Sequence, residues 1–139
     1  RPMINSKDLN FSFSGLKTAV LYEIKRLKKE KKLDAQKKFD ISLAFQDAAI
    51  ECLVKKSCDA MAKENCVQLV LSGGVAANQA LRESFKMKID IKNIFYPDLS
   101  RCTDNGAMIA FAASEKLNFE RDLAIKVKPR WSLEEINNG

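Results

Sequence analysis

The residues best suited to ligand binding follow the apolar run "VQLVL" (67–71), which predicts a buried strand. Gly73 and Gly74 come directly after this run, where a strand turns into a helix. Glycines there permit positive φ and let a ligand approach the backbone, and the next helix offers free N–H groups to an anion. Asn78, in the first turn of that helix, can hydrogen-bond a sugar or phosphate oxygen. A Gly-Gly turn of this kind is more often simple chain reversal, and it matches neither GxGxxG nor GxxxxGKT.

A second polar stretch, "SRCTDNGAMIA" (100–110), contains the acidic residue Asp104 two positions before Gly106. Thr103 or Asp104 stands where a cap of the following apolar helix is expected. The stretch holds more candidate caps than one helix needs, so the carboxylate could also bind a metal or direct a nucleotide. One carboxylate is an incomplete metal site, and further ligands would have to come from elsewhere.

Several classes of protein are disfavoured by composition. The sequence has no histidine, which removes the commonest general base and metal ligand, so a complete His-dependent active site is excluded. Its 139 residues fit one domain, and no apolar run is long enough for a membrane span or resembles a signal peptide. Because the first residue is also Arg1 rather than Met, we expect a soluble piece cut from a longer protein. Without CxxC pairs, the four cysteines are expected to be reduced thiols: Cys52, Cys58, Cys66 and Cys102.

The net charge of +6 comes from one region, 25–38, which contains eight basic residues against Glu30 and Asp34. The remaining sequence has sixteen basic and sixteen acidic residues. Such a lysine run is typical of a solvated helix end. The alternative is a contact to a phosphate backbone that positions a nucleic acid without reading its bases. The lysines at the centre of this basic patch are Lys28, Lys29, Lys31 and Lys32.

The spacing of apolar residues predicts alternating helices and strands, and therefore an α/β arrangement. Ser14 is expected to cap the first helix, Asn65 to end the second, and the last helix to be buried because it is apolar nearly all round. The predicted elements are a strand at 10–16, a helix from 16 to about 30, a helix from about 40 to 65, a strand at 67–71, a helix at 77–86, a strand at 93–96 and a helix from about 104.

Four motifs resemble, in this order, the carboxy-terminal part of the tRNA N6-adenosine threonylcarbamoyltransferase (TsaD/Gcp) family. They are "FSFSGLKTAV" (11–20), "GGVAANQALR" (73–82), "CTDNGAMIA" (102–110) and "VKPRWSL" (127–133). The resemblance implies a helix-rich α/β lobe of the actin/Hsp70/sugar-kinase-like (ribonuclease H-like) fold. Residues 1–139 would form the single carboxy-terminal lobe of a two-lobe protein.

The resemblance also implies an activity, the transfer of a threonylcarbamoyl group from threonylcarbamoyl-AMP to N6 of the adenosine 3′ of the anticodon in tRNA. Asp104 then matches a ligand of a divalent metal, with iron favoured and zinc or magnesium as alternatives. Asn78, Gly73 and Gly74 match positions that contact the adenylate, whereas Ser14 and its neighbours are assigned to packing. Partner proteins of the tRNA-modifying complex, the missing amino-terminal lobe and a cytoplasmic location follow from the same resemblance.

The sequence departs from the family pattern in one respect, because the family's other two metal ligands are a His-x-x-x-His pair that this chain lacks. The isolated lobe is therefore expected to be inactive and metal-free, and to self-associate through surface that its mate normally covers. Two alternatives remain, a kinase-like or ATPase nucleotide-binding domain and a non-catalytic assembly module. An older family label, metal-dependent glycoprotease, fits poorly without a histidine beside the metal.

Overall fold

The computed structural model describes residues 3–115 and divides into two units at Asp104. The first unit contains α1 (Phe13–Lys29), α2 (Ala35–Lys63) and α3 (Gln79–Lys86), together with strands β1 (Leu69–Val70) and β2 (Ile94–Phe95). Three short 3₁₀ helices connect them: η1 (Gly74–Ala77), η2 (Ile91–Asn93) and η3 (Leu99–Arg101). The second unit contains α4 (Gly106–Ser114). Each unit is described by itself.

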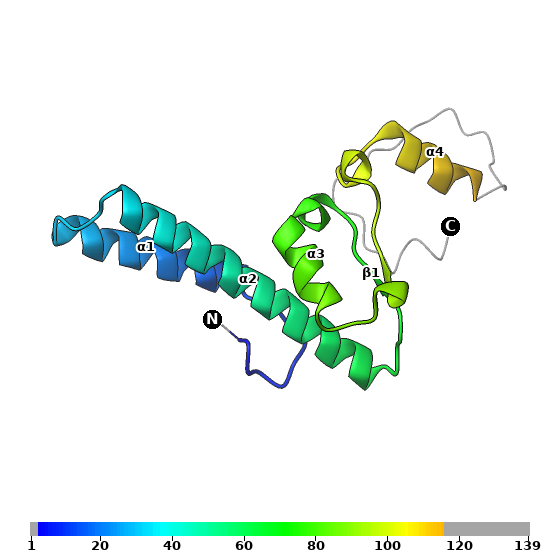
Figure 1. Cartoon of the computed structure of the whole chain (residues 1–139), viewed down its shortest axis with the longest axis horizontal. Helices are drawn as coiled ribbons and strands as arrows, with labels where there is room; N and C mark the ends of the chain where they lie inside the picture. The colour runs from blue at the N-terminus through cyan, green and yellow to red at the C-terminus, as the bar shows by residue number, and fades with distance from the viewer. Residues whose placement is uncertain (1–2, 116–139) are drawn as a thin grey trace, which may run out of the picture. The chain divides into compact units, whose positions relative to one another are not determined.

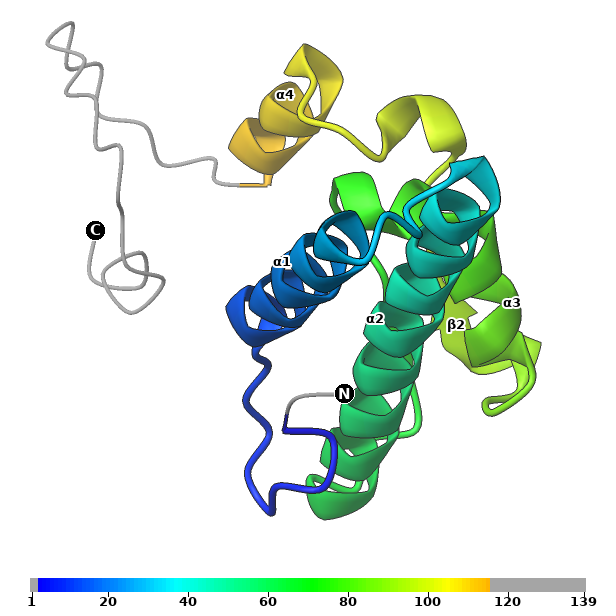
Figure 2. The ribbon, with the colours of Figure 1, turned by 90° about the vertical axis from the view of Figure 1, so that its left-hand side faces the viewer.

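Helices α1 and α2 form a hairpin and lie side by side in both views of the ribbon (Figures 1 and 2). Lys31 in the connecting turn has a left-handed φ of 55°. The carboxylate of Asp34 then accepts a hydrogen bond from the backbone N–H of Lys37 at 2.7 Å and caps α2. This cap explains why α2 begins at Ala35 and not near residue 40, where the apolar periodicity starts.

The predicted strand at 10–16 is wrong, because α1 begins at Phe13. Ser14 lies inside the helix and not at its cap, and Ser12 occupies the cap position without a side-chain hydrogen bond. The alternating phenylalanines Phe11 and Phe13 stack their rings, with centroids 5.8 Å apart. Two aromatic residues at spacing two therefore indicated a strand where they in fact stack on each other at a helix start.

A β-α-β unit follows α2 and confirms the α/β prediction. Strands β1 and β2 pair in parallel, with Leu69 opposite Ile94 and Val70 opposite Phe95, and α3 provides the crossover. Asn65, in the turn after α2, has a φ of 53°, as expected for a residue that ends a helix. Helix α3 packs against α2 through one apolar cluster: Ile50, Val54, Leu81, Phe85 and Ile94. Leu69 and Leu71 pack against the same cluster, which therefore holds β1 and the residues after it against the two helices.

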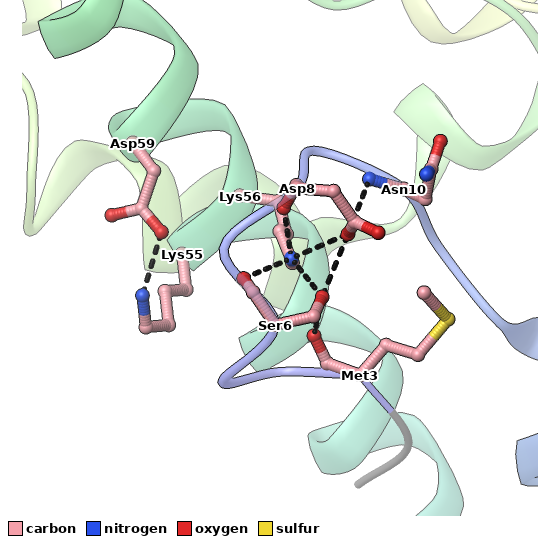
Figure 3. Close-up of polar contacts among 7 residues, drawn as sticks. All are labelled: Met3, Ser6, Asp8, Asn10, Lys55, Lys56 and Asp59. Carbon is pink, nitrogen blue, oxygen red and sulfur yellow. Dashed lines mark hydrogen bonds and ion pairs between the residues drawn. The ribbon is translucent and has the colours of Figure 1, made fainter.

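The amino-terminal segment is anchored to α2 by a buried lysine (Figure 3). Lys56 is 1% exposed, and its Nζ donates to the backbone oxygens of Ser6 and Asp8, with the Ser6 contact at 3.0 Å. It also donates to the Ser6 hydroxyl at 2.8 Å and lies 3.5 Å from the Asp8 carboxylate. The pKa of Asp8 is lowered by hydrogen bonds to its carboxylate, chiefly the one from the Ser6 hydroxyl and secondly the one from Asn10. The buried charge is thus surrounded by oxygen acceptors.

Lys56→Met is expected to release residues 3–10 from α2. The apolar stem of the side chain is retained while the charged donor is lost, so the local free energy of opening falls by about 2 kcal/mol. Hydrogen exchange of the amides in 3–10 then accelerates by about 30-fold. The neighbouring Lys55→Met is the control, because Lys55 forms an exposed pair with Asp59 at 2.6 Å and contributes less than about 1 kcal/mol. Equal exchange rates in both variants would contradict the anchoring role.

Helix α4 differs from its prediction in two ways. Its cap is Asn105, whose Oδ1 accepts from the N–H of Met108 at 2.9 Å, and not Thr103 or Asp104. It is also not buried, since Ile109 is 64% exposed and no residue of α4 is classed as buried. The predicted continuation of this helix beyond residue 115, and the motif at 127–133, lie outside the described residues.

The four cysteines are free thiols, as predicted from their spacing. Cys52 and Cys102 are buried, while Cys66 is exposed. Burial raises the pKa of the Cys58 thiol. No helix within residues 3–115 is long and apolar enough to cross a membrane.

Candidate functional site

The glycine turn lies at the carboxyl end of β1, where the sequence placed it. Gly73 adopts a φ of 79° and a ψ of 175°, a conformation that L side chains rarely adopt. A Cβ at Gly73 would meet no described atom within 4 Å, so one face of the turn is open. A cavity of about 250 Å³ borders the turn, with Ser72, Val75 and Ala76 in its lining. The predicted positive φ is confirmed at Gly73.

Asn78 follows η1 and caps α3. Its Oδ1 accepts a hydrogen bond from the backbone N–H of Leu81 at 3.0 Å, and its Nδ2 donates to Oε1 of Gln46 in α2 at 3.2 Å. The side chain is therefore oriented by both helices, with one N–H of the amide outside these two bonds. Its role in substrate binding stays a prediction, and this N–H is the group left to serve it.

Asp104 is exposed and lies at the end of the first unit, after η3. Its carboxylate makes no hydrogen bond or ion pair with another described residue. Because it does not cap α4, the capping explanation for this carboxylate is removed. Asp104 is available to a cation or to a polar group of a ligand.

The glycine turn and the segment before Asp104 lie next to each other. A Cβ built on Gly74 would be 4.0 Å from Cγ2 of Thr103. Arg82, one turn into α3, links the two stretches further by donating to the backbone oxygen of Ala76 at 2.6 Å and to that of Pro97 at 3.0 Å. The glycine turn and the part of the second stretch that ends at Asp104 are therefore brought together at one edge of the first unit.

The donor set for a metal is incomplete on the described residues. No group of three or more histidine, cysteine, aspartate or glutamate side chains is placed to hold an ion within residues 3–115. A carboxylate oxygen is a suitable ligand for iron, zinc or magnesium, so Asp104 fits as one ligand of several. The remaining ligands would have to come from outside this part of the chain.

The larger cavities lie away from this edge. One of about 610 Å³ runs between α2 and α3 and includes Cys58 and Met87, and another of about 580 Å³ lies between α1 and α2. Both are grooves between helices, and neither includes a residue of the glycine turn or Asp104 in its lining. We place the candidate site at the glycine turn because a positive-φ glycine lies there beside the segment that leads to Asp104, and Arg82 bridges the two stretches.

The basic patch lies at the hairpin tip, where Lys28 and Lys29 end α1 and Lys31 and Lys32 form the turn. Part of its charge is paired. Arg26 bonds Glu23 at 2.6 Å and Glu30 at 2.9 Å, which raises the pKa of the arginine, and Lys32 lies 3.1 Å from Glu30.

Three of the four central lysines are unpaired among the described residues, so their ammonium groups face solvent or a ligand. Lys28, Lys29 and Lys31 are exposed and form no ion pair with the described residues. Lys28 and Lys31 also line a shallow cavity of about 440 Å³ with Lys38. This arrangement is suited to an extended anion, and the solvated helix end also remains consistent with it.

Comparison with known proteins decides the family. Residues 1–111 match the TsaD family, described as tRNA N6-adenosine threonylcarbamoyltransferase. The chain belongs to this family. Curated relatives with that name include those of Bordetella avium, 47% identical over 100% of this chain, and Paraburkholderia xenovorans, 48% identical over 96%. The protein of Herminiimonas arsenicoxydans is 47% identical over 98% of the chain.

The chain spans about two fifths of the length of these relatives, which is 43% of the Bordetella protein and 41% of the other two. The threonylcarbamoyltransferase family match confirms the resemblance drawn from the motifs. The match contains both the glycine turn and Asp104, which lie within residues 1–111.

Two residues of the site were missed by sequence reasoning. Arg82 stands inside the motif at 73–82, but nothing in its local pattern reveals that it reaches Pro97. Gln46 lies on α2 and meets Asn78 only through the packing of α2 on α3. An arginine one helical turn after a capping residue was the available signal for the first, and no local signal existed for the second.

Proposed function

We propose that this chain is the carboxy-terminal lobe of a two-lobe, actin-like tRNA threonylcarbamoyltransferase. The intact protein would move the threonylcarbamoyl group from threonylcarbamoyl-AMP to N6 of the adenosine 3′ of the anticodon. The observation that carries the proposal is that the two motif stretches lie next to each other. A Cβ built on Gly74 would be 4.0 Å from the methyl group of Thr103. Family membership supplies the reaction class.

The proposed roles follow from the groups at this edge. Backbone N–H groups beside Gly73 and Gly74 approach the phosphate of the adenylate, because the open face of Gly73 leaves room for it. The free N–H of Asn78 donates to a sugar or phosphate oxygen. Asp104 contributes one ligand to a divalent cation, with iron favoured over zinc and magnesium, and such a cation would act as a Lewis acid.

The reaction itself needs little covalent chemistry from this lobe. The N6 amine of the adenosine forms a bond to the carbamoyl carbon while the bond from that carbon to the phosphate oxygen breaks. AMP leaves with the bonding electron pair, and the amine releases its proton. Backbone N–H groups at the glycine turn would stabilise the charge that develops on the departing phosphate. The lobe therefore binds and orients the donor and stabilises the leaving group.

The direct test is transfer by the protein that combines this chain with the amino-terminal half present in its relatives. Threonylcarbamoyl-AMP and tRNA are supplied, and the modified nucleoside is measured by mass spectrometry. We expect product with both halves and none with this chain alone, because half a cleft does not exclude water. Hydrolysis of ATP without tRNA modification would instead favour the kinase-like alternative.

The basic patch is proposed to contact the tRNA backbone. In the intact protein, glutamate at positions 28, 29, 31 and 32 should weaken tRNA binding. It should also make the fall of log K with log salt shallower, reducing the magnitude of the slope by about 3 to 4. The matched control reverses four exposed lysines outside this region, with a smaller expected effect: Lys7, Lys63, Lys88 and Lys92. An unchanged salt dependence in the fourfold variant would reject the tRNA contact.

The proposed partners follow from the same assignment. The missing lobe, tRNA and the partner proteins of the modifying complex would be met in the cytosol, where the tRNA substrate is. The exposed apolar side chains of α4, among them Met108, Ile109 and Phe111, make this helix a candidate surface for covering by such partners. The same surface would drive self-association of the isolated lobe.

A further inference from the structure

We infer that Arg82 is a positioning residue that fixes the glycine turn against the segment carrying Asp104. The inference deepens the proposed function and rests on it, since it concerns the same site. Arg82 does not reach the open face of the turn. It acts through the backbone and side chains that it joins, and these belong to both motif stretches.

The guanidinium of Arg82 has a different partner on each side. Its Nε donates to the backbone oxygen of Ala76 in η1 at 2.6 Å. One terminal nitrogen donates to the backbone oxygen of Pro97 at 3.0 Å and to Sγ of Cys102 at 3.3 Å. The flat face of the group lies over the ring of Tyr96, 4.2 Å from its centroid. One side chain therefore joins η1, the loop after β2 and the residue that follows η3.

Two partners of Arg82 are buried. Ala76 and Cys102 are each 2% exposed, so the two ends of the link are held inside the packed unit. Arg82 forms no ion pair with a carboxylate among the described residues. Its charge is met by carbonyl dipoles, a sulfur atom and an aromatic face, which is a directional arrangement rather than a charge pair.

A planar fork is required for this geometry. The guanidinium presents its donors in fixed directions, whereas a lysine ammonium is a compact point charge with no preferred plane. Lysine at position 82 would keep the charge but not the simultaneous bonds to Ala76 and Pro97. The structure therefore assigns to Arg82 a role that depends on shape as well as on charge.

Loss of the link should move the two motif stretches relative to each other. Arg82 also continues the helix that Asn78 caps, since its N–H donates to the backbone oxygen of Asn78 at 3.2 Å. A displacement of about 1 Å at an active site lowers turnover by about 100-fold. The expected defect lies in kcat, because tRNA contacts at the hairpin tip do not involve this link.

The test uses Arg82→Lys and Arg82→Ala in the intact protein, with Lys86→Ala as the control on the same helix. Lys86 is half-buried and pairs with the exposed Glu83 at 2.9 Å, and it forms none of the bonds that Arg82 makes to Ala76, Pro97 and Cys102. We expect kcat to fall about 100-fold in both Arg82 variants with KM for tRNA within about twofold, and guanidinium ion to restore part of the turnover of Arg82→Ala. The folded fraction is measured by circular dichroism so that unfolding is not counted as a loss of kcat.

The inference is overturned if folded Arg82→Lys and Arg82→Ala retain kcat within about threefold of the unsubstituted protein. It is also overturned if the loss equals the unfolded fraction and guanidinium restores nothing. A second readout separates this inference from the proposed function. Hydrogen exchange at 74–77 and at 99–102 should accelerate together in Arg82→Ala but not in Lys86→Ala, even if the intact protein modifies no tRNA.

Discussion

Asp104→Ala in the intact protein is expected to lower kcat for threonylcarbamoyl transfer by at least about 100-fold and to reduce the bound metal. The carboxylate is exposed and does not cap α4, so its removal should cost little stability. The physical reason for the defect is the loss of a hard oxygen ligand from the proposed metal site, whose other ligands would have to come from outside the described residues. Turnover is measured with threonylcarbamoyl-AMP and tRNA, and metal content by elemental analysis.

Asp98→Ala is the matched control, since Asp98 is an exposed carboxylate in the same segment and its side chain caps nothing in η3. Turnover and metal content should stay near those of the unsubstituted protein. If Asp104→Ala kept full metal content and full turnover, Asp104 would be removed from the site. If both variants lost turnover equally, the effect would belong to the segment and not to the Asp104 carboxylate.

Phe85→Ala is expected to lower the free energy of unfolding of the first unit by about 3–5 kcal/mol. Phe85 is 1% exposed and packs within the cluster that joins α3 to α2 and β2. Removing its ring leaves a cavity that the surrounding side chains fill only in part. The loss should be read from native-state hydrogen exchange of amides in α2, because a multidomain protein does not unfold in one step.

Met87→Ala provides the comparison, since Met87 ends the same helix but is 77% exposed. Its expected effect is within about 0.5 kcal/mol. Phe85→Ala should also reduce turnover through loss of the folded unit, with KM unchanged for the fraction that remains folded. A destabilisation by Phe85→Ala no larger than that by Met87→Ala would show that this cluster does not hold the glycine turn in place.

Apolar spacing predicted the long helices, and the short apolar runs at 67–71 and 93–96 predicted the two strands, whereas the alternation at 10–16 misled. The apolar spacing of α2 located that helix, but its first turn is polar and was found only through the cap at Asp34. Phe11 and Phe13 imitated a strand because stacked rings and a half-buried strand share the same spacing. Helix α4 was expected to be buried because its residues are apolar, yet apolar composition does not specify what covers a helix.

The candidate site was predictable where backbone chemistry decides it. The positive φ of Gly73 follows from a strand that turns directly into a helix, and a residue such as Asn78 at that start is a natural cap. The bond from Asn78 to Gln46 and the links made by Arg82 join residues far apart in sequence. Such contacts depend on tertiary packing and leave no local pattern.

The central claim is that the glycine turn and the segment carrying Asp104 border the same site. Cysteines introduced at Gly74 and Thr103 in the intact protein test it most directly, because a Cβ at Gly74 would lie 4.0 Å from the Thr103 methyl group. After mild oxidation and digestion without reductant, mass spectrometry should find the peptides joined by a disulfide in most molecules. Two free thiols in a folded, oxidised protein would contradict the claim, and with it the proposed site.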